Sequence, residues 1–268
     1  MDFSAEQDLK NHLLNNNDEL KKKLKITIWF LVILFFIFII MAIIVVAVRE
    51  KNSDHLIIEP PSGEHTHTII FLPGLSEKPE NFEDLFSKNL TFKNQNNTKI
   101  IILRSSSMTL SYDGNDTFSW FDILSLPINS SECYSYEGMK NSSDILKDFI
   151  EEEKSKLNGN YSKIIIGGNN IGAMVSLYTG FKVIKEKLGG IFSINGILPE
   201  KDDILPGKED LQVLYAYEEN NIFIQSDNFD NIKKKLNDRD VEFKTYTNSD
   251  IDIKKIEDLV QFLNRTLI

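Results

Sequence analysis

The 268-residue chain has few of the residues that most often build metal sites and catalytic pairs, with one cysteine and four histidines. The single cysteine, Cys133, excludes an intramolecular disulfide and a cysteine-based metal site, and we interpret it as a buried apolar side chain. Basic residues are also outnumbered, because 30 Lys and Arg stand against 40 Asp and Glu, giving a net charge of −10. Such a chain offers no basic face for phosphate groups, so we expect no nucleic-acid partner.

Histidine is absent after residue 67, because the four histidines are His12, His55, His65 and His67. Imidazole is the most common general base in enzymes, so most of the chain lacks that group. His65 and His67 could face one side of a strand and, with Glu64, hold a metal ion. Solvated side chains are the simpler interpretation, since the usual third ligand is not evident, and we expect no metal or other cofactor.

Charged residues are missing from one long hydrophobic run, residues 26–48. The run is long enough for a helix to cross a bilayer and exceeds the core of a cleaved signal peptide. Lysines cluster just before it, which predicts a single-pass type II anchor with a cytoplasmic N-terminus and a lumenal or extracellular remainder. The predicted segments are a cytoplasmic tail (1–25), a transmembrane signal anchor (26–48), a stalk (49–65) and a folded domain (66–268).

Seven N-x-[S/T] triplets follow the hydrophobic run, and none precedes it. Such triplets are glycosylated in secreted and lumenal domains, so their placement agrees with the predicted topology. The candidate glycosylation sites are Asn89, Asn96, Asn115, Asn129, Asn141, Asn160 and Asn264.

Beyond residue 65, short β-branched runs alternate with helical patterns. Runs such as "IIIG" lack polar alternation, which is typical of parallel strands buried on both faces. The pattern predicts a doubly wound α/β domain with a mainly parallel sheet. Expected strands cover 68–72, 99–103, 162–166, 190–194, 212–216 and 241–246, and expected helices cover 81–88, 142–157, 172–187, 228–236 and 253–267. Residues 104–141 form the longest irregular region, which we expect to cover the ligand pocket.

Two turns lie at the carboxyl ends of the expected strands, where such sheets bind their ligands. "FLPGLSE" follows the strand at 68–72, and "GGNNIGA" follows the strand at 162–166. In the second turn, Gly168 and Gly172 keep the spacing of a G-x-S-x-G nucleophile elbow, whose strained backbone lifts the central side chain out of the sheet. The central residue here is Asn170 rather than serine.

Four segments, in order, resemble the acyl-protein thioesterase and carboxylesterase family of α/β-hydrolases over nearly all of residues 66–268. "IIFLPGLSEKPENFEDLF" is similar to the segment after the family's first core strand, and "FSWFDI" is similar to its S-W-F-D segment. "IIIGGNNIGAMVSLYTG" resembles its nucleophile elbow, and "VEFKTYTNSD" resembles the strand that leads towards its catalytic histidine. The resemblance implies an α/β-hydrolase fold.

Carried over by position, the resemblance also implies that the catalytic residues have been replaced. Asn170 stands at the nucleophilic serine, and Pro73 stands at the histidine of the first turn. The acid maps to about Asn220 and the catalytic histidine to about Ile251. A carboxamide is a poor nucleophile and does not shuttle protons near neutral pH. In α/β-hydrolases the histidine follows the nucleophile along the chain, and here none does.

Other features of the family site are expected to persist. The resemblance implies that the backbone N–H groups of Leu75 and Ile171 form an oxyanion hole. It also places Pro73, Trp120 and Phe121 at the pocket, although packing in the core is an equally good interpretation of the two aromatic rings.

These observations favour a catalytically inactive, membrane-anchored hydrolase-like domain that binds an acyl- or lipid-like ligand or a partner protein. An alternative is an active esterase or thioesterase with a relocated nucleophile among Ser105, Ser106 and Ser107 and with Glu218 or Glu219 as the base. A third hypothesis is a structural subunit of a membrane assembly.

Overall fold

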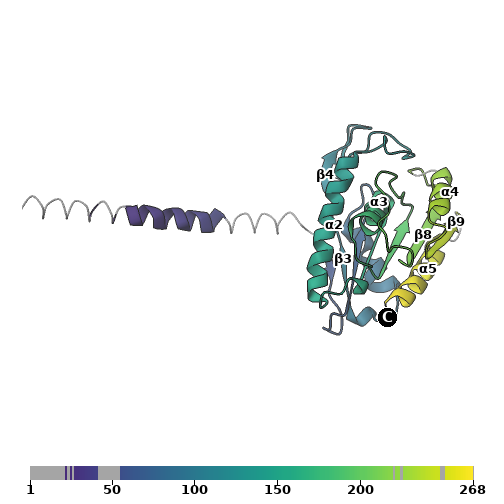
Figure 1. The fold of residues 1–268 in the computed structure, drawn as a ribbon, viewed down its shortest axis with the longest axis horizontal. Helices are drawn as coiled ribbons and strands as arrows, with labels where there is room; N and C mark the ends of the chain where they lie inside the picture. Colours follow the sequence, from purple (N-terminus) through teal and green to yellow (C-terminus); the bar gives the residue numbers. More distant parts are fainter. Residues whose placement is uncertain are drawn as a thin grey trace, which may run out of the picture. The chain divides into compact units, whose positions relative to one another are not determined.

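The computed structural model describes residues 22, 25, 27–41, 55–219, 221–223, 226–247 and 251–267. The chain divides into two compact units, Met1–Asp54 and His55–Ile268, which are drawn in Figure 1 and described separately below. The predicted family positions Asn220 and, for its side chain, Ile251 lie outside what is described.

In the N-terminal unit, residues 27–41 are helical. Its large apolar side chains are exposed, as Trp29 (68%) and Phe38 (71%) illustrate. Among the described residues, no helix has both the length and the hydrophobicity needed to cross a bilayer. Residues 26 and 42–48 of the predicted anchor are outside the described part of the chain.

A seven-stranded sheet forms the centre of the second unit, in the order β1-β3-β2-β6-β7-β8-β9 (Figure 1). Six of these strands run parallel to one another, and β1 runs antiparallel to β3 at one edge. The strands are β1 (Leu56–Ile58), β2 (His67–Leu72), β3 (Thr98–Ile102), β6 (Ile164–Asn169), β7 (Gly190–Ile194), β8 (Val213–Glu218) and β9 (Val241–Tyr246). The predicted doubly wound, mainly parallel sheet is confirmed.

Helices cover both faces of this sheet. The α-helices are α2 (Tyr136–Lys156), α3 (Asn170–Tyr178), α4 (Ser226–Lys235) and α5 (Ile251–Thr266). Shorter helical turns are η1 (Pro79–Phe82), η2 (Leu85–Asn89), η3 (Gln95–Asn97), η4 (Tyr161–Lys163) and η5 (Thr179–Val183). The expected helix at 81–88 is thus two short turns, and the one at 172–187 ends as an α-helix at Tyr178 and continues as η5.

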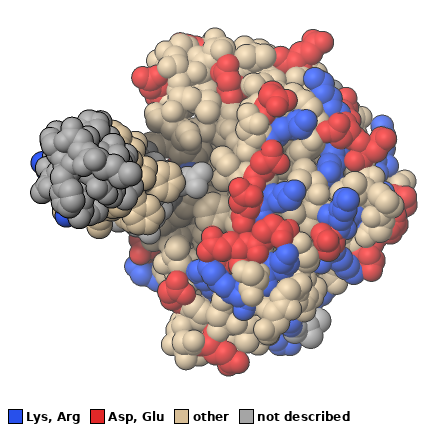
Figure 2. All heavy atoms as spheres, turned by 60° about the vertical axis from the view of Figure 1, so that its left-hand side comes forward, with Lys and Arg blue, Asp and Glu red and all other residues tan. Residues whose placement is uncertain are grey.

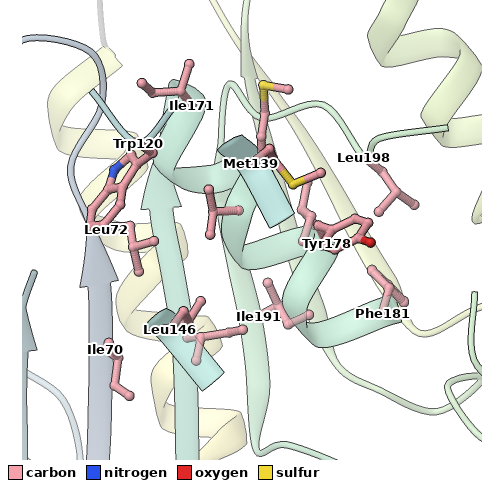
Figure 3. Close-up of a cluster of buried hydrophobic side chains, with 14 of the residues drawn as sticks. Ile70, Leu72, Trp120, Met139, Leu146, Ile171, Tyr178, Phe181, Ile191 and Leu198 are labelled. Atoms are coloured by element: carbon pink, nitrogen blue, oxygen red, sulfur yellow. The ribbon is translucent and has the colours of Figure 1, made fainter. Parts of the chain in front are cut away.

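Alternate residues of each strand enter two separate cores, because successive side chains point to opposite faces. Ile70 and Leu72 pack with α2, α3 and α4, while Ile69 and Phe71 pack with α5 and η2. Figure 3 shows the first core, where Leu146 of α2 lies over the sheet near Ile70. Both faces are therefore buried, which explains why these strands read as uninterrupted apolar runs.

One buried charged cluster lies under α2. Glu153, which is 1% exposed, accepts hydrogen bonds from Thr68, Lys99 (3.2 Å) and Lys156 (2.8 Å). Burial opposes its charged form, but the two ammonium groups outweigh that effect and hold the pKa of Glu153 below its ordinary value. The cluster ties α2 to the amino-terminal ends of β2 and β3.

Two predicted irregular segments contain strands. Within the predicted stalk, β1 pairs Leu56 with Ile102 and Ile58 with Ile100, so this part of the stalk belongs to the sheet. A run of three apolar residues is too short to reveal a strand without its partner. Within 104–141, β4 (Ser106–Thr109) and β5 (Asp116–Ser119) form an antiparallel hairpin. On the face shown in Figure 2, acidic and basic side chains are interspersed rather than gathered by sign.

Candidate functional site

The turn between β6 and α3 has the geometry of a nucleophile elbow. The strand ends at Asn169 and the helix begins at Asn170, with no loop between them. Asn170 has φ +47°, in the left-handed region that non-glycine residues rarely adopt and that asparagine tolerates better than most. A strained, sharp strand-to-helix turn is the defining feature of this elbow. The tip of the turn therefore carries a carboxamide in place of a hydroxyl.

The two elbow glycines are required by close backbone contact. A Cβ on Gly168 would lie 2.5 Å from the carbonyl carbon of Gly172 and 2.6 Å from the nitrogen of Ala173. A Cβ on Gly172 would overlap the carbonyl oxygens of Leu72 and Pro73. The second overlap also shows that the turn after β6 packs directly against the turn after β2. The structure thus brings together the two turns singled out in the sequence.

Hydrogen bonds fix the orientation of the Asn170 side chain. Its Oδ1 accepts a hydrogen bond from Asn221 Nδ2 at 3.2 Å, and Asn221 Oδ1 in turn accepts one from the backbone N–H of Phe223 at 2.9 Å. Asn170 is 9% exposed. Its Nδ2 lies near Gly74, at 3.2 Å from the position that a Cβ of Gly74 would take. These contacts hold a neutral amide at the place where a hydrolase carries its nucleophile.

The described histidines lie away from the elbow. His67 begins β2, whose carboxyl end adjoins the elbow roughly 16 Å further along the strand. Its ring nitrogens contact Thr66 (2.8 Å) and Lys163 (3.2 Å), while His65 contacts Thr68 (2.8 Å). Different partners thus engage the two rings that could have shared a metal ion. In the described part of the chain, no three His, Cys, Asp or Glu side chains form such a site.

The third described histidine, His55, precedes β1 at the edge of the sheet. It accepts a hydrogen bond from the backbone of Arg104 and packs edge-on against Phe149. The partners described for these three histidines are therefore groups other than Asn170.

The serine cluster does not form a catalytic pair in the described structure. Ser105 is buried, and its hydroxyl has no hydrogen-bond partner among the described groups. Ser106 and Ser107 are exposed on β4, opposite Ser119 and Phe118 of β5. Of the two proposed bases, the Glu218 carboxylate is paired with Lys255, and Glu219 is exposed.

A groove of about 720 Å³ opens at the carboxyl ends of the central strands. Its walls come from η1 and η2, from the ends of β6, β7 and β8, and from the start of α5. The lining residues are Glu77, Asn81, Phe82, Asp84, Leu85, Asn89, Asn169, Asn170, Ile194, Asn195, Glu218, Asn221, Ile222, Phe223, Lys255, Ile256 and Leu259. Asn170 is thus part of an open groove, as the nucleophile of an α/β-hydrolase would be.

The residues predicted to line the pocket are in the core instead. Pro73 is buried, and its carbonyl accepts a hydrogen bond from Trp120 Nε1 at 2.7 Å. Phe121 is buried against Tyr134. Figure 3 shows Trp120 beside Leu72 and Ile171 within the first core. Of the two interpretations of these rings, core packing therefore holds, and none of the three residues lines the groove.

Glu77, which no sequence motif singled out, supports the first turn. Its carboxylate accepts hydrogen bonds from the backbone N–H of Gly74 and from Asn169 Nδ2 (2.9 Å). Burial raises the pKa of Glu77, with Glu218 adding to the rise and the two hydrogen bonds opposing it. Leu75 and Ile171, the implied oxyanion donors, follow directly after Gly74 and Asn170. In the sequence, the only sign of this role is that Glu77 lies in the turn that follows the carboxyl end of β2.

The seven candidate glycosylation sites differ in exposure. Six are exposed, whereas Asn264 is half-buried and its side-chain oxygen accepts a hydrogen bond from the backbone of Lys93 at 2.6 Å. Cys133 is buried and donates a hydrogen bond to Asn129.

Comparison with known proteins supports the interpretation of the fold. A phospholipase/carboxylesterase family model matches residues 53–267. Acyl-protein thioesterase 1 of Yarrowia lipolytica is 33% identical over 147 residues, 54% of this chain and 63% of that protein. Acyl-protein thioesterase 1 of Aspergillus fumigatus is 27% identical over 231 residues, 78% of this chain and 92% of that protein. The match to the first relative therefore spans less than two thirds of its length.

Solved structures show the same fold at low identity. Acyl-protein thioesterase 2 of Zea mays superposes with a TM-score of 0.63 at 20% identity, covering 80% of this chain and 99% of that one. SOBER1 of Arabidopsis thaliana superposes with a TM-score of 0.66 at 16% identity, covering 75% and 99%. The family model matches most of the chain, and the elbow and the parallel sheet agree with that match. The chain therefore belongs to the phospholipase/carboxylesterase family and has the α/β-hydrolase fold.

Proposed function

We propose that this protein is a catalytically inactive member of its family, held at a membrane, whose groove binds a ligand outside the cytoplasm. The relatives named acyl-protein thioesterases suggest an acyl- or lipid-like ligand as the starting hypothesis, with a partner protein as the alternative.

The observation that carries the proposal is that the elbow keeps its backbone geometry but has lost its nucleophile. The turn keeps its strained backbone and both close-packed glycines, yet its tip is a hydrogen-bonded carboxamide. No histidine follows it in the sequence, so the usual general base is missing as well. An oxyanion hole without a triad gives only about 10³–10⁴-fold acceleration over water in a well-studied protease, far below the rates of ordinary enzymes.

The open groove favours ligand binding over a purely structural role. A domain that served only as a packing surface would have no reason to keep about 720 Å³ of space at the former catalytic centre. Polar groups from several segments converge on this space, which is typical of a binding site.

Membrane attachment rests on the N-terminal unit. The helix at 27–41 is apolar on all sides and exposes residues such as Trp29 and Phe38, and lysines precede it. A helix of that composition is stable when lipid surrounds it. Together with the seven sequons that follow, this supports a type II orientation.

The test is hydrolysis by the full chain in detergent, with a palmitoyl-peptide thioester and a short-chain ester as substrates. The expected rate is the same for the parent chain, for Asn170→Ala and for a Ser105/Ser106/Ser107→Ala triple variant, and it equals that of buffer with detergent. Turnover that one of the variants abolishes would overturn the proposal and identify the nucleophile.

A further inference from the structure

Asparagine is concentrated in the groove. It accounts for 25 of the 268 residues of the chain but for 6 of the 17 residues that line the groove. These asparagines come from η1, η2, the elbow and the segments that follow β7 and β8, so the concentration arises only in the folded chain. They are Asn81, Asn89, Asn169, Asn170, Asn195 and Asn221.

Backbone N–H groups determine which way several of these amides point. Asn81 Oδ1 accepts a hydrogen bond from the backbone of Lys78, and Asn195 Oδ1 accepts one from the backbone of Glu218, both at 2.8 Å. Because a backbone N–H can only donate, the side-chain atom that faces it must be the amide oxygen. The NH₂ group of each side chain is therefore turned the other way.

The same reasoning orients the amides at the elbow. Asn221 Oδ1 accepts from the backbone of Phe223, so its Nδ2 is the donor to Asn170 Oδ1, and Asn170 presents its own NH₂ group. Asn169 is oriented in the opposite sense, since its Nδ2 donates to the Glu77 carboxylate and its oxygen is the remaining group. The groove thus presents both donors and acceptors in fixed positions.

The charges of the lining disfavour an anionic ligand. Glu77, Asp84 and Glu218 line the groove together with Lys255; Asp84 is paired with Lys88 and Glu218 with Lys255, which leaves the Glu77 carboxylate as the excess charge. A fatty carboxylate or a phosphate headgroup would therefore meet net negative charge. A long acyl chain would cover amide groups without offering them partners, and each such loss weakens binding by about 5- to 150-fold.

We infer that the groove binds a neutral, hydroxyl-rich ligand, a saccharide, rather than an acyl chain. A hydroxyl both donates and accepts, so an array of oriented amides matches it. Phe82 and Phe223 also line the groove and supply apolar surface for the C–H faces of a sugar ring, and the other apolar lining residues are Leu85, Ile194, Ile222, Ile256 and Leu259. This inference rests on the proposed function, in which the domain is catalytically inactive. An active hydrolase would need a groove that binds its ester or thioester substrate instead.

The saccharide has two sources that the experiment must separate. Asn89 lines the groove and belongs to a sequon, so a glycan on this residue would start at the groove itself. A glycan of another molecule is the second source. Bacterial expression removes the first source, and Thr91→Ala removes it in eukaryotic cells without changing the Asn89 side chain.

The experiment uses the full chain from bacteria, in a detergent without a sugar headgroup. Saturation-transfer NMR and titration calorimetry are run with neutral trisaccharides of glucose, mannose and N-acetylglucosamine, and with palmitate and a palmitoyl peptide. The test variant is Asn170→Gly, because glycine keeps the left-handed backbone and deletes only the amide. The matched control is Asn158→Gly, an exposed asparagine with φ +56° outside the groove.

We expect at least one trisaccharide to bind, with Asn170→Gly weakening it about tenfold and Asn158→Gly leaving it unchanged. The parent protein and its Thr91→Ala variant are then compared after expression in eukaryotic cells. If the Asn89 glycan occupies the groove, the parent should bind the added sugar less tightly than the variant. If the ligand belongs to another molecule, the two proteins should bind the sugar equally tightly. Binding of palmitate or the palmitoyl peptide alone, or of no trisaccharide, would overturn the inference and leave the inactive-domain proposal standing. Hydrolysis of the palmitoyl peptide would instead overturn the proposed function.

Discussion

The close packing of the elbow gives a direct test of the geometry on which the proposal depends. In Gly168→Ala, the new methyl group would lie 2.5 Å from the carbonyl carbon of Gly172 and 2.6 Å from the nitrogen of Ala173. Ordinary contact between such atoms begins about 1 Å further out. Both obstructing atoms belong to the backbone of α3, so a change of rotamer cannot relieve the overlap and the helix itself must move.

Overpacking of this kind costs about 3 kcal/mol, at the upper end of the usual range. For a domain of this size, each kcal/mol corresponds to about 2–4 °C, so the melting temperature should fall by about 6–12 °C. The fluorescence of Trp120, which is buried and bonded to the turn beside the elbow, reports the transition. A denaturant titration should show a lower midpoint with an unchanged slope.

Gly114→Ala is the control, because Gly114 has φ +72° and no atoms within 4 Å of its added methyl group. It isolates the cost of a left-handed alanine, about 1 kcal/mol, or about 2–4 °C. If Gly168→Ala is no more destabilised than Gly114→Ala, the elbow is not closely packed, and the argument that its glycines were retained for the turn geometry fails.

Three further predictions concern stability and topology. Glu153→Gln should lower the free energy of unfolding by about 3 kcal/mol in denaturant titrations, because Lys99 would stay buried without its carboxylate partner. The pKa of Glu153 is lowered in the folded state, so the parent protein should lose stability as the pH falls below 4.5. The Glu153→Gln variant should lose less stability over the same pH range. Asn170→Gly should unfold within about 1 kcal/mol of the parent, whereas Asn170→Val should lose about 2 kcal/mol or more at φ +47°. For protein made in eukaryotic cells, Asn115→Gln should increase gel mobility by the loss of one glycan, whereas Asn264→Gln should leave the mobility unchanged. The reason is that Asn115 is exposed, while Asn264 is half-buried and accepts a hydrogen bond from the backbone of Lys93. Equal shifts for the two variants would contradict the idea that exposure decides which sequon is glycosylated.

The central fold could be predicted because its signals are local. Strands buried on both faces read as runs such as Ile164–Ile166, and the spacing of Gly168 and Gly172 reflects a backbone constraint that only glycine meets. By contrast, β1 is a three-residue edge strand, and its only indication is its pairing with β3. The strands of the β4–β5 hairpin are rich in serine and threonine and have only Met108 and Phe118 as large apolar residues, so no hydrophobic alternation marks them.

The candidate site was only partly predictable. Asn170 followed from the elbow spacing, but the other groove asparagines come from separate segments and converge only through the fold. Trp120 was assigned to the pocket by resemblance, although its indole is committed to the carbonyl of Pro73. Glu77 acts through the backbone of Gly74, a contact that residue types and spacing do not reveal.

Covalent trapping tests the absence of a nucleophile most directly. The full chain in detergent is incubated with a fluorophosphonate and, separately, with an activated thioester, and its intact mass is measured beside that of an active family member. We expect an unchanged mass for this chain and an adduct on the active relative. An adduct on this chain, localised by peptide mapping to Ser105, Ser106, Ser107 or any groove residue, would contradict the claim that the domain is catalytically inactive.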